Sequence, residues 1–390
     1  MRIGMIAPPW FPVPPPKYGG TEAIVSLLVD GLTAAGLDVT LFASGDSRTA
    51  ATLASVHAEA PSARIGEMSV ELEHVLSCLA RKDEFDLVHD HSGLLAVTLA
   101  ASCATPFVHT AHGPLTGHSR VLYEDALSFN PAARLIGLTK AQQSFAPELP
   151  WLATCPNAIE VDRFPFRDEH EGYLAFLGRM SIEKGAGEAI RVALAAGRQL
   201  RIAAKCREPM EVAYFDAHVK PHLGNGIEYV GELGHDDKAA LLGGAAALLF
   251  PIDWEEPFGL VLAEAAACGT PVVATRRGSV PELVIDGATG FVVGSPAEMP
   301  AAIERLDELD RAAIRASAEE RFAPAAMIAA YLNAYELLLQ ERVGSRPTER
   351  LVERLQGRTR RSRTHAVASA GRRPSAEGAL ATSSSAASSG

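Results

Sequence analysis

Two glutamates with seven residues between them, Glu256 and Glu264, are the first pair in this sequence that could do chemistry. In a continuous helix, the rise of about 1.5 Å per residue would separate their carboxylates by about 12 Å along the axis. Glycosidases need their two carboxylates closer together, about 5 to 9.5 Å apart. The spacing therefore disfavours glycoside hydrolysis.

The residues between these glutamates could bind an anion. Pro257 fits the first position of a helix, and the next three residues would then present unpaired backbone N–H groups at its positive end; these are Phe258, Gly259 and Leu260. A buried carboxylate such as Glu264 also needs a polar partner. We expect either solvent, Arg276 or Arg277 as that partner, or the hydroxyl groups of a ligand. A ligand with hydroxyl groups at both ends and a diphosphate between them has the layout of a nucleotide sugar.

The segment GRMSIEKG adds two cations, Arg179 and Lys184. Ser181 is predicted to cap a helix, which would place Lys184 in the first turn, against the helix dipole. A bound diphosphate would supply the missing negative charge. The alternative is that both cations are solvated surface groups near Glu183.

Two adjacent glycines, Gly19 and Gly20, stand at a predicted strand-to-helix turn, where they allow close approach of backbone to phosphate or sugar. The GxGxxG pattern of dinucleotide-binding proteins is absent from this turn. The pair is therefore a weak indication of a phosphate site by itself.

Five histidines cluster at or near the ends of predicted strands: His89, His91, His109, His112 and His118. Histidine is the commonest metal ligand, but these residues show no clean ligand spacing. No Asp-x-Asp pair stands at a strand end to hold a metal-bound diphosphate. We therefore expect no metal, and His109 to be structural.

Apolar runs predict the elements that must position these residues. In the first half they occupy 2–7, 38–44, 85–91, 106–113 and 134–139, with a helix over about 21–35. In the second half they occupy 173–179, 200–205, 227–231, 246–251, 271–275 and 290–293, and a last helix covers 324–343. Alternating strands and helices predict two doubly wound α/β domains with parallel sheets, whose ligands bind beyond the carboxyl ends of the strands.

The composition limits which classes of binding partner and which cellular compartment are expected. The net charge of −11 disfavours a specific nucleic-acid partner. Five cysteines without CxxC spacing, and prolines early in MRIGMIAPPW, predict a cytoplasmic protein without a signal peptide. From Glu341 onward the chain has ten Arg, no Lys and four Glu. We predict that the Ser/Ala/Arg-rich residues 344–390 are disordered and act mainly as a spacer, with weak peripheral contact to anionic membranes as the alternative.

The joint pattern of motifs resembles a known family. EPFGLVLAE, FLGRMSIEKG, CPNAIEVDRF, TAHG, ACGTPVVAT and VPELVIDGATGFVV look like the retaining GT-B glycosyltransferases of family 4. The N-terminal PPWFPVPPPKYGGTE is similar to the branch that includes avilamycin-type antibiotic glycosyltransferases. The resemblance implies two Rossmann-like domains facing a central cleft. Residues 1–163 would be the acceptor side, 164–323 the nucleotide-sugar domain, and 324–343 a helix that crosses back to the first domain.

The resemblance also implies roles for the candidate residues. His112, Glu256, Arg179 and Lys184 would be catalytic, with His112 beside the transferred sugar. The donor would be bound by Gly19, Gly20, Arg179, Lys184, Glu256, Phe258, Gly259, Leu260 and Glu264. Glu256 would contact the sugar and Glu264 the ribose. The sequence departs from the family pattern at Ala158, Glu160 and Arg277, where Gly, Asp and Gly are usual.

The implied function is metal-independent, retaining transfer of a hexose-type sugar from a nucleoside-diphosphate donor to an acceptor hydroxyl, without a cofactor. The acceptor could be a carbohydrate, a lipid-linked molecule or a small natural product. Two alternatives stay open, because a fold does not fix a function. One is a sugar-nucleotide epimerase or hydrolase with the GT-B fold, and the other is a non-catalytic sugar-nucleotide-binding protein.

Overall fold

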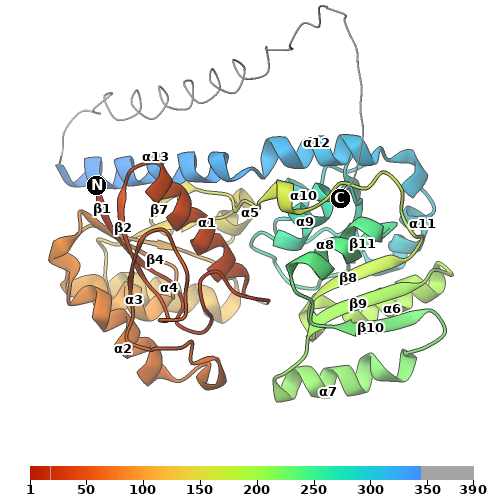
Figure 1. The fold of residues 1–390 in the computed structure, drawn as a ribbon, viewed down its shortest axis with the longest axis horizontal. Coiled ribbons are helices and arrows are strands. Elements are labelled where there is room, and N and C mark those ends of the chain that lie inside the picture. The colour runs from red at the N-terminus through yellow and green to blue at the C-terminus, as the bar shows by residue number, and fades with distance from the viewer. Residues whose placement is uncertain (18, 344–390) are drawn as a thin grey trace, which may run out of the picture. The chain divides into compact units, whose positions relative to one another are not determined.

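The strands form two separate parallel sheets, one in each half of the chain (Figure 1). The structure is a computed structural model that describes residues 1–17 and 19–343. The predicted spacer at residues 344–390 lies outside the described residues. Two parallel sheets covered by helices confirm the predicted doubly wound α/β fold class.

The first sheet has seven strands in the order β3-β2-β1-β4-β5-β6-β7. In chain order these are β1 (Arg2–Ile6), β2 (Asp38–Phe42), β3 (Thr52–Ala54), β4 (Leu87–Asp90), β5 (Phe107–Thr110), β6 (Arg134–Gly137) and β7 (Trp151–Thr154). The helices are α1 (Gly20–Ala34), α2 (Met68–Leu79), α3 (Leu94–Leu99), α4 (Gly117–Phe129) and α5 (Lys140–Ser144). All five predicted strands are present. β3 and β7 were not predicted; they lie at the two edges of the sheet and are only half buried.

The second sheet has six strands in the order β10-β9-β8-β11-β12-β13. These are β8 (Leu174–Arg179), β9 (Leu200–Lys205), β10 (Ile227–Gly231), β11 (Ala247–Phe250), β12 (Val272–Thr275) and β13 (Gly290–Val293). The helices are α6 (Ala186–Ala195), α7 (Pro209–His218), α8 (His235–Gly244), α9 (Leu260–Ala267), α10 (Val280–Leu283) and α11 (Met299–Ile303). Each strand agrees with its prediction to within one residue at either end.

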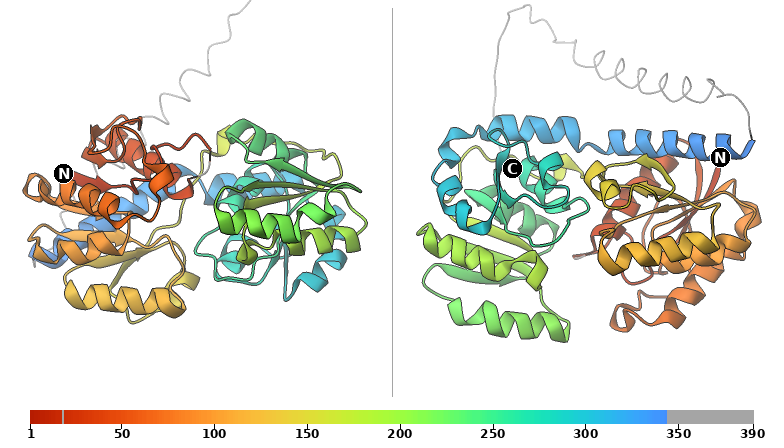
Figure 2. Two further views of the ribbon diagram at one scale, coloured as in Figure 1. Left: turned by 90° about the horizontal axis from the view of Figure 1, so that it is seen from below. Right: turned by 180° about the vertical axis from the view of Figure 1, so that it is seen from behind.

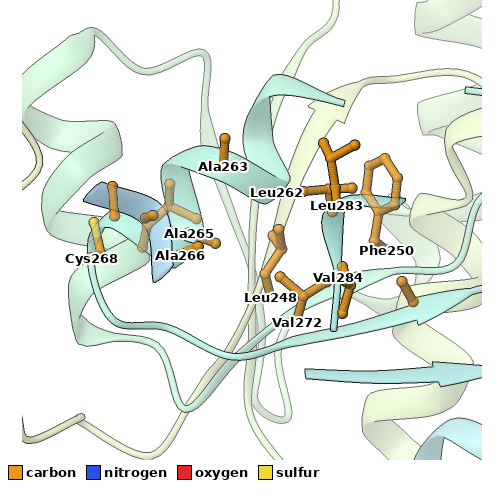
Figure 3. Packing of buried hydrophobic residues seen from close by; sticks show 14 of the residues in the cluster. Leu248, Phe250, Leu262, Ala263, Ala265, Ala266, Cys268, Val272, Leu283 and Val284 are labelled. Carbon is orange, nitrogen blue, oxygen red and sulfur yellow. The ribbon is translucent and has the colours of Figure 1, made fainter. Parts of the chain in front are cut away.

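The core of the second sheet explains why its central strands read as unbroken apolar runs. Strands covered by helices on both faces bury the side chains of both faces. Figure 3 shows Leu248 and Val272 of neighbouring strands packed with Leu262 and the alanines of α9. The small alanines let α9 pack close to the sheet. They therefore help to set the distance between the sheet and the N-terminus of α9, which is the candidate anion site.

The last two helices are α12 (Arg311–Arg321) and α13 (Pro324–Val343). Together, Arg311–Glu341 are long and apolar enough to cross a membrane by length and composition alone. The stretch is interrupted at 322–323, however, and the side chains of Tyr331 and Tyr335 are fully buried in the core of the first sheet. We therefore interpret α13 as a core helix, packed against α1 and β7 (Figure 2).

The link between the sheets, residues 155–173, contains one short 3-10 turn, η4 (Val161–Arg163). Both sheets belong to one compact unit. The predicted division at residues 163 and 164 therefore stays a prediction.

Glu22 provides a test of the first helix. Its side chain is buried in the first turn of α1, and burial raises the pKa of its carboxyl to about 7. Because the folded pKa lies above the unfolded value of about 4.5, the folded state holds this proton more tightly. The stability that it contributes is complete below about pH 4.5 and is lost as the pH rises through about 7. We expect Glu22→Gln to unfold at a temperature that depends less on pH across this range, measured by scanning calorimetry. Parallel pH profiles for the variant and the natural chain would contradict this.

Candidate functional site

All ten sequence-predicted site residues line a single cavity. Its volume is about 840 Å³, and it is bordered by the carboxyl ends of strands from both sheets. The residues that it brings together are Gly19, Gly20, His112, Arg179, Lys184, Glu256, Phe258, Gly259, Leu260 and Glu264. We call it the central cavity. Asn157 and Glu160 also line it, whereas Arg277 is not among its lining residues.

Helix α9 begins three residues later than predicted. Its first residue is Leu260, and Gly259 before it adopts a left-handed conformation with φ of 81°. Pro257 is therefore not the first helical residue, and the carbonyl of Pro257 accepts a hydrogen bond from the Thr139 hydroxyl at 2.9 Å. The expected separation of about 12 Å between the glutamates assumed a continuous helix and does not apply. The sequence signal for the later start of α9 is Gly259, because glycine readily adopts the positive φ that interrupts a helix.

The N-termini of α1 and α9 lie close together in the wall of the central cavity. A Cβ atom on Gly20, at the start of α1, would lie 3.3 Å from the Leu260 side chain at the start of α9. Gly19 has a φ of 145°, a conformation that favours glycine. Both helix ends therefore present backbone to the same cavity, as an anion site requires.

Glu256 and Lys184 form an ion pair inside the cavity. The Lys184 ammonium donates to Glu256 Oε2 at 2.6 Å, and the Trp254 indole N–H donates to the same oxygen at 3.0 Å. The ammonium also lies 4.2 Å from the centroid of the Trp254 ring. Glu256 therefore already supplies a negative charge to Lys184, a partner that the sequence analysis did not foresee.

The turn that carries Lys184 differs from the prediction. Lys184 ends a 3-10 turn, η5 (Ile182–Lys184), and α6 starts only after Gly185. Ser181 does not cap a helix, because its hydroxyl donates to Glu183 at 2.7 Å. Lys184 is thus not in the first turn of a capped helix. Glycine is required at 185, where φ is 79° and a Cβ atom would lie 2.4 Å from the Pro251 carbonyl oxygen.

Arg179 lies at the end of β8, beside Lys184. One of its terminal nitrogens donates to Glu183 at 2.8 Å. Its Nε is buried and has no hydrogen-bond partner among the described residues. A buried guanidinium N–H without an acceptor is rare in folded proteins.

Glu264 pairs with Lys238 of α8. Sequence reasoning expected solvent, Arg276 or Arg277 as the protein partner, and this was wrong. The pairing depends on α8 and α9 being neighbours, and no local pattern around Lys238 encodes it. The side chains of Lys238 and Glu264 are both at least three-quarters buried. The ion pair therefore avoids the free-energy cost of a buried charge without a partner.

His112 follows β5 and contacts a second histidine. Its Nε2 lies 2.8 Å from Nδ1 of His91, which follows the neighbouring strand β4. Burial, aided by His109, lowers the pKa of His112 to about 3, so its imidazole is neutral at pH 7. His109 itself is held between Asp90 at 2.6 Å and the Tyr123 hydroxyl at 2.9 Å. Within residues 1–17 and 19–343, no group of three or more His, Cys, Asp or Glu side chains could hold a metal ion.

Known protein families match both parts of the chain. A family model described as "Glycosyltransferase Family 4" matches residues 18–159, and one described as "Glycosyl transferases group 1" matches residues 171–308. The glycogen synthase of Mycobacterium tuberculosis is 32% identical in an alignment of 232 residues that covers 53% of this chain and 55% of that protein. The chain therefore spans about half the length of the curated relatives that it matches first.

Solved structures match over more of the chain. AviGT4, a glycosyltransferase involved in avilamycin A biosynthesis, is 27% identical with a TM-score of 0.65, over 87% of this chain and 98% of that chain. The Anabaena protein HepE, solved in complex with UDP and glucose, is 18% identical with a TM-score of 0.67, over 86% of this chain and 99% of that chain. These matches confirm the fold class predicted from the sequence.

Proposed function

The chain has the GT-B fold of the glycosyltransferases, and from this premise we propose that it transfers a hexose-type sugar from a nucleoside-diphosphate donor to an acceptor hydroxyl. The observation that carries the proposal is the central cavity. It gathers the cations Arg179 and Lys184, the carboxylates Glu256 and Glu264, the neutral His112 and the N-termini of α1 and α9. The complex of HepE with UDP and glucose supports a nucleotide-sugar donor for a fold of this kind.

The diphosphate is proposed to lie between Arg179, Lys184 and the start of α9. The unpartnered Nε of Arg179 would gain an acceptor, and the N–H groups after Gly259 would meet negative charge at a positive helix end. The sugar would then lie near Glu256 and His112, and the ribose near Glu264. No metal is needed in this arrangement, because fixed cations stabilise the leaving diphosphate.

The proposed reaction retains the configuration of the sugar. The bond between the anomeric carbon and the β-phosphate oxygen breaks, and the acceptor oxygen bonds to the same face of that carbon. The proton of the acceptor hydroxyl passes to the departing phosphate oxygen, so no protein nucleophile is required. The proposed compartment is the cytoplasm, and all five cysteines are free thiols in the structure.

The first test is a thermal-shift screen against UDP, GDP, ADP and TDP. A nucleotide that binds only the folded state raises the unfolding temperature by mass action. The matching sugar donors are then incubated with a panel of acceptors, and the anomeric configuration of the product is read by NMR. Donor consumption without any acceptor would indicate an epimerase or hydrolase. Binding without turnover on any acceptor would indicate a non-catalytic binder, and an inverted product would exclude retention.

The Glu264–Lys238 pair gives a sharper test of donor binding. We expect Glu264→Gln to weaken the binding of the nucleoside diphosphate about 10-fold, since a charged acceptor for the ribose hydroxyls becomes a neutral one. Isothermal titration calorimetry measures the change. Asp237→Asn removes an exposed carboxylate from α8, one residue before Lys238, and should leave the affinity unchanged. Equal affinities for Glu264→Gln and Asp237→Asn would place the ribose elsewhere.

A further inference from the structure

His91 contacts His112, and the surroundings of its two ring nitrogens determine which of them carries the proton. His91 is 3% exposed, and its Nδ1 lies 2.8 Å from His112 Nε2. Its other ring nitrogen, Nε2, is buried and has no hydrogen-bond partner among the described residues. The ring of His89 lies beside the ring of His91, with centroids 4.1 Å apart and a tilt of 47°.

Both members of this pair are neutral imidazoles at pH 7. Burial is the main cause that lowers the pKa of each, and the neighbouring histidines lower the pKa of His91 further. A neutral imidazole carries one proton, so one ring nitrogen donates and the other accepts. In the hydrogen bond between His91 Nδ1 and His112 Nε2, one nitrogen therefore donates its proton and the other accepts it.

Two arrangements satisfy this contact. If His112 donated, the proton of His91 would sit on its buried Nε2, which no acceptor of residues 1–17 or 19–343 reaches. If His91 donates from Nδ1, only a lone pair is left unpartnered at Nε2. Orphaned buried N–H donors are rarer in folded proteins than under-satisfied acceptors, which favours the second arrangement.

The geometry points to His91 as a positioning residue that fixes the tautomer of His112. His91 donates from Nδ1 to His112 Nε2, so the proton of His112 resides on its own Nδ1. His112 lines the central cavity, and its Nδ1 is the ring nitrogen that His91 does not occupy. The Nδ1–H group of His112 would therefore donate a hydrogen bond to a hydroxyl or ring oxygen of the sugar that is transferred. This inference rests on the proposed function for the identity of the sugar, but the tautomer itself does not.

The surroundings of the pair hold it in place. His91 follows β4 and its backbone N–H donates to Ile6 at 2.8 Å, while His112 follows the adjacent strand β5. His89 is fixed on both ring nitrogens, by the Tyr335 hydroxyl at 2.7 Å and the Thr110 hydroxyl at 2.8 Å. The neighbouring His89 ring, tilted by 47° to that of His91, therefore cannot turn to accept a proton from His91 without breaking its own hydrogen bonds.

The tautomer is measured directly by long-range ¹H–¹⁵N NMR on the ligand-free chain with ¹⁵N-labelled histidine. His112 is assigned by the signal that disappears in His112→Gln. We expect its Nδ1 to show the shift of a protonated ring nitrogen and its Nε2 that of an unprotonated one. The reverse pattern would overturn the inference whether or not the chain transfers a sugar. Absence of transfer with the expected pattern would contradict the proposed function and leave this inference standing.

Variants separate positioning from simple packing. His91→Leu removes the hydrogen bond, and we expect kcat to fall about 10-fold with little change in the donor KM. His91→Asn keeps an amide N–H near the place of Nδ1 and should restore most of that loss. His91→Asp offers only an acceptor there, and should move the proton of His112 to Nε2 in the NMR spectrum. Equal losses in the Leu and Asn variants, or an unchanged His112 tautomer in the Asp variant, would overturn the role of His91.

Discussion

Replacing Lys184 by methionine should lower kcat/KM for sugar transfer by about 100- to 1000-fold, the usual effect of losing one preorganised charge from a site where negative charge develops. Methionine keeps the length of the side chain but cannot offset the charge of the leaving diphosphate. Steady-state kinetics with a saturating acceptor measures the loss. Lys220→Met, which removes an exposed cation paired with Asp216, should leave the rate unchanged.

A double variant distinguishes lost catalysis from lost stability. Lys184→Met alone leaves Glu256 as a buried carboxylate whose remaining side-chain hydrogen bond within the described part of the chain comes from the neutral Trp254 N–H, which costs stability. Lys184→Met combined with Glu256→Gln removes that charge and should restore much of the unfolding temperature. Activity should stay low in the double variant. Recovery of both together would mean that Lys184 acts only by supporting the fold.

Replacing Gly185 by alanine should destabilise the protein by more than about 3 kcal/mol, because backbone strain and a clash add. The new Cβ would lie 2.4 Å from the Pro251 carbonyl oxygen, at a residue whose φ is 79°. Neither atom belongs to a flexible side chain, so η5 must shift, and Lys184 shifts with it. We therefore expect weaker donor binding as well as lower stability, measured by denaturant unfolding and calorimetry.

Gly197 provides the matched control. Its φ is 63°, but a Cβ atom there would meet nothing within 4 Å. Gly197→Ala should cost only the conformational strain, about 1 to 2 kcal/mol. The difference between the two variants isolates the contact with Pro251. Equal costs would show that the backbone around Gly185 relaxes freely.

The sheet architecture was predictable because its signal is local. The strands around Leu248 and Val272 are buried on both faces, so each is an unbroken apolar run that can be read without knowing its neighbours. The edge strands β3 and β7 carry a weaker signal, since an edge strand is partly solvated and need not be apolar throughout. Residues just after the central strands were correctly expected to meet in one cavity.

The local details of the site were less predictable because they depend on the tertiary structure. Pro257 and Ser181 are good helix-start residues, but the chain begins α9 and α6 later, after Gly259 and Gly185. Glycine can adopt either a positive or a negative φ, so its presence in the sequence does not show which of the two it will have. The partner of Glu264 depends on which helix lies beside α9, and a single sequence does not encode that neighbour locally.

The burial of α13 in the first sheet affects the order of events during synthesis. Met327, Tyr331, Tyr335 and Leu338 belong to the same apolar cluster as β1 and α1, which emerge from the ribosome far earlier. The amino-terminal half cannot complete this cluster until almost all of the described chain has been translated. A nascent chain halted after the second sheet should therefore display exposed apolar surface on its first half and attract chaperones.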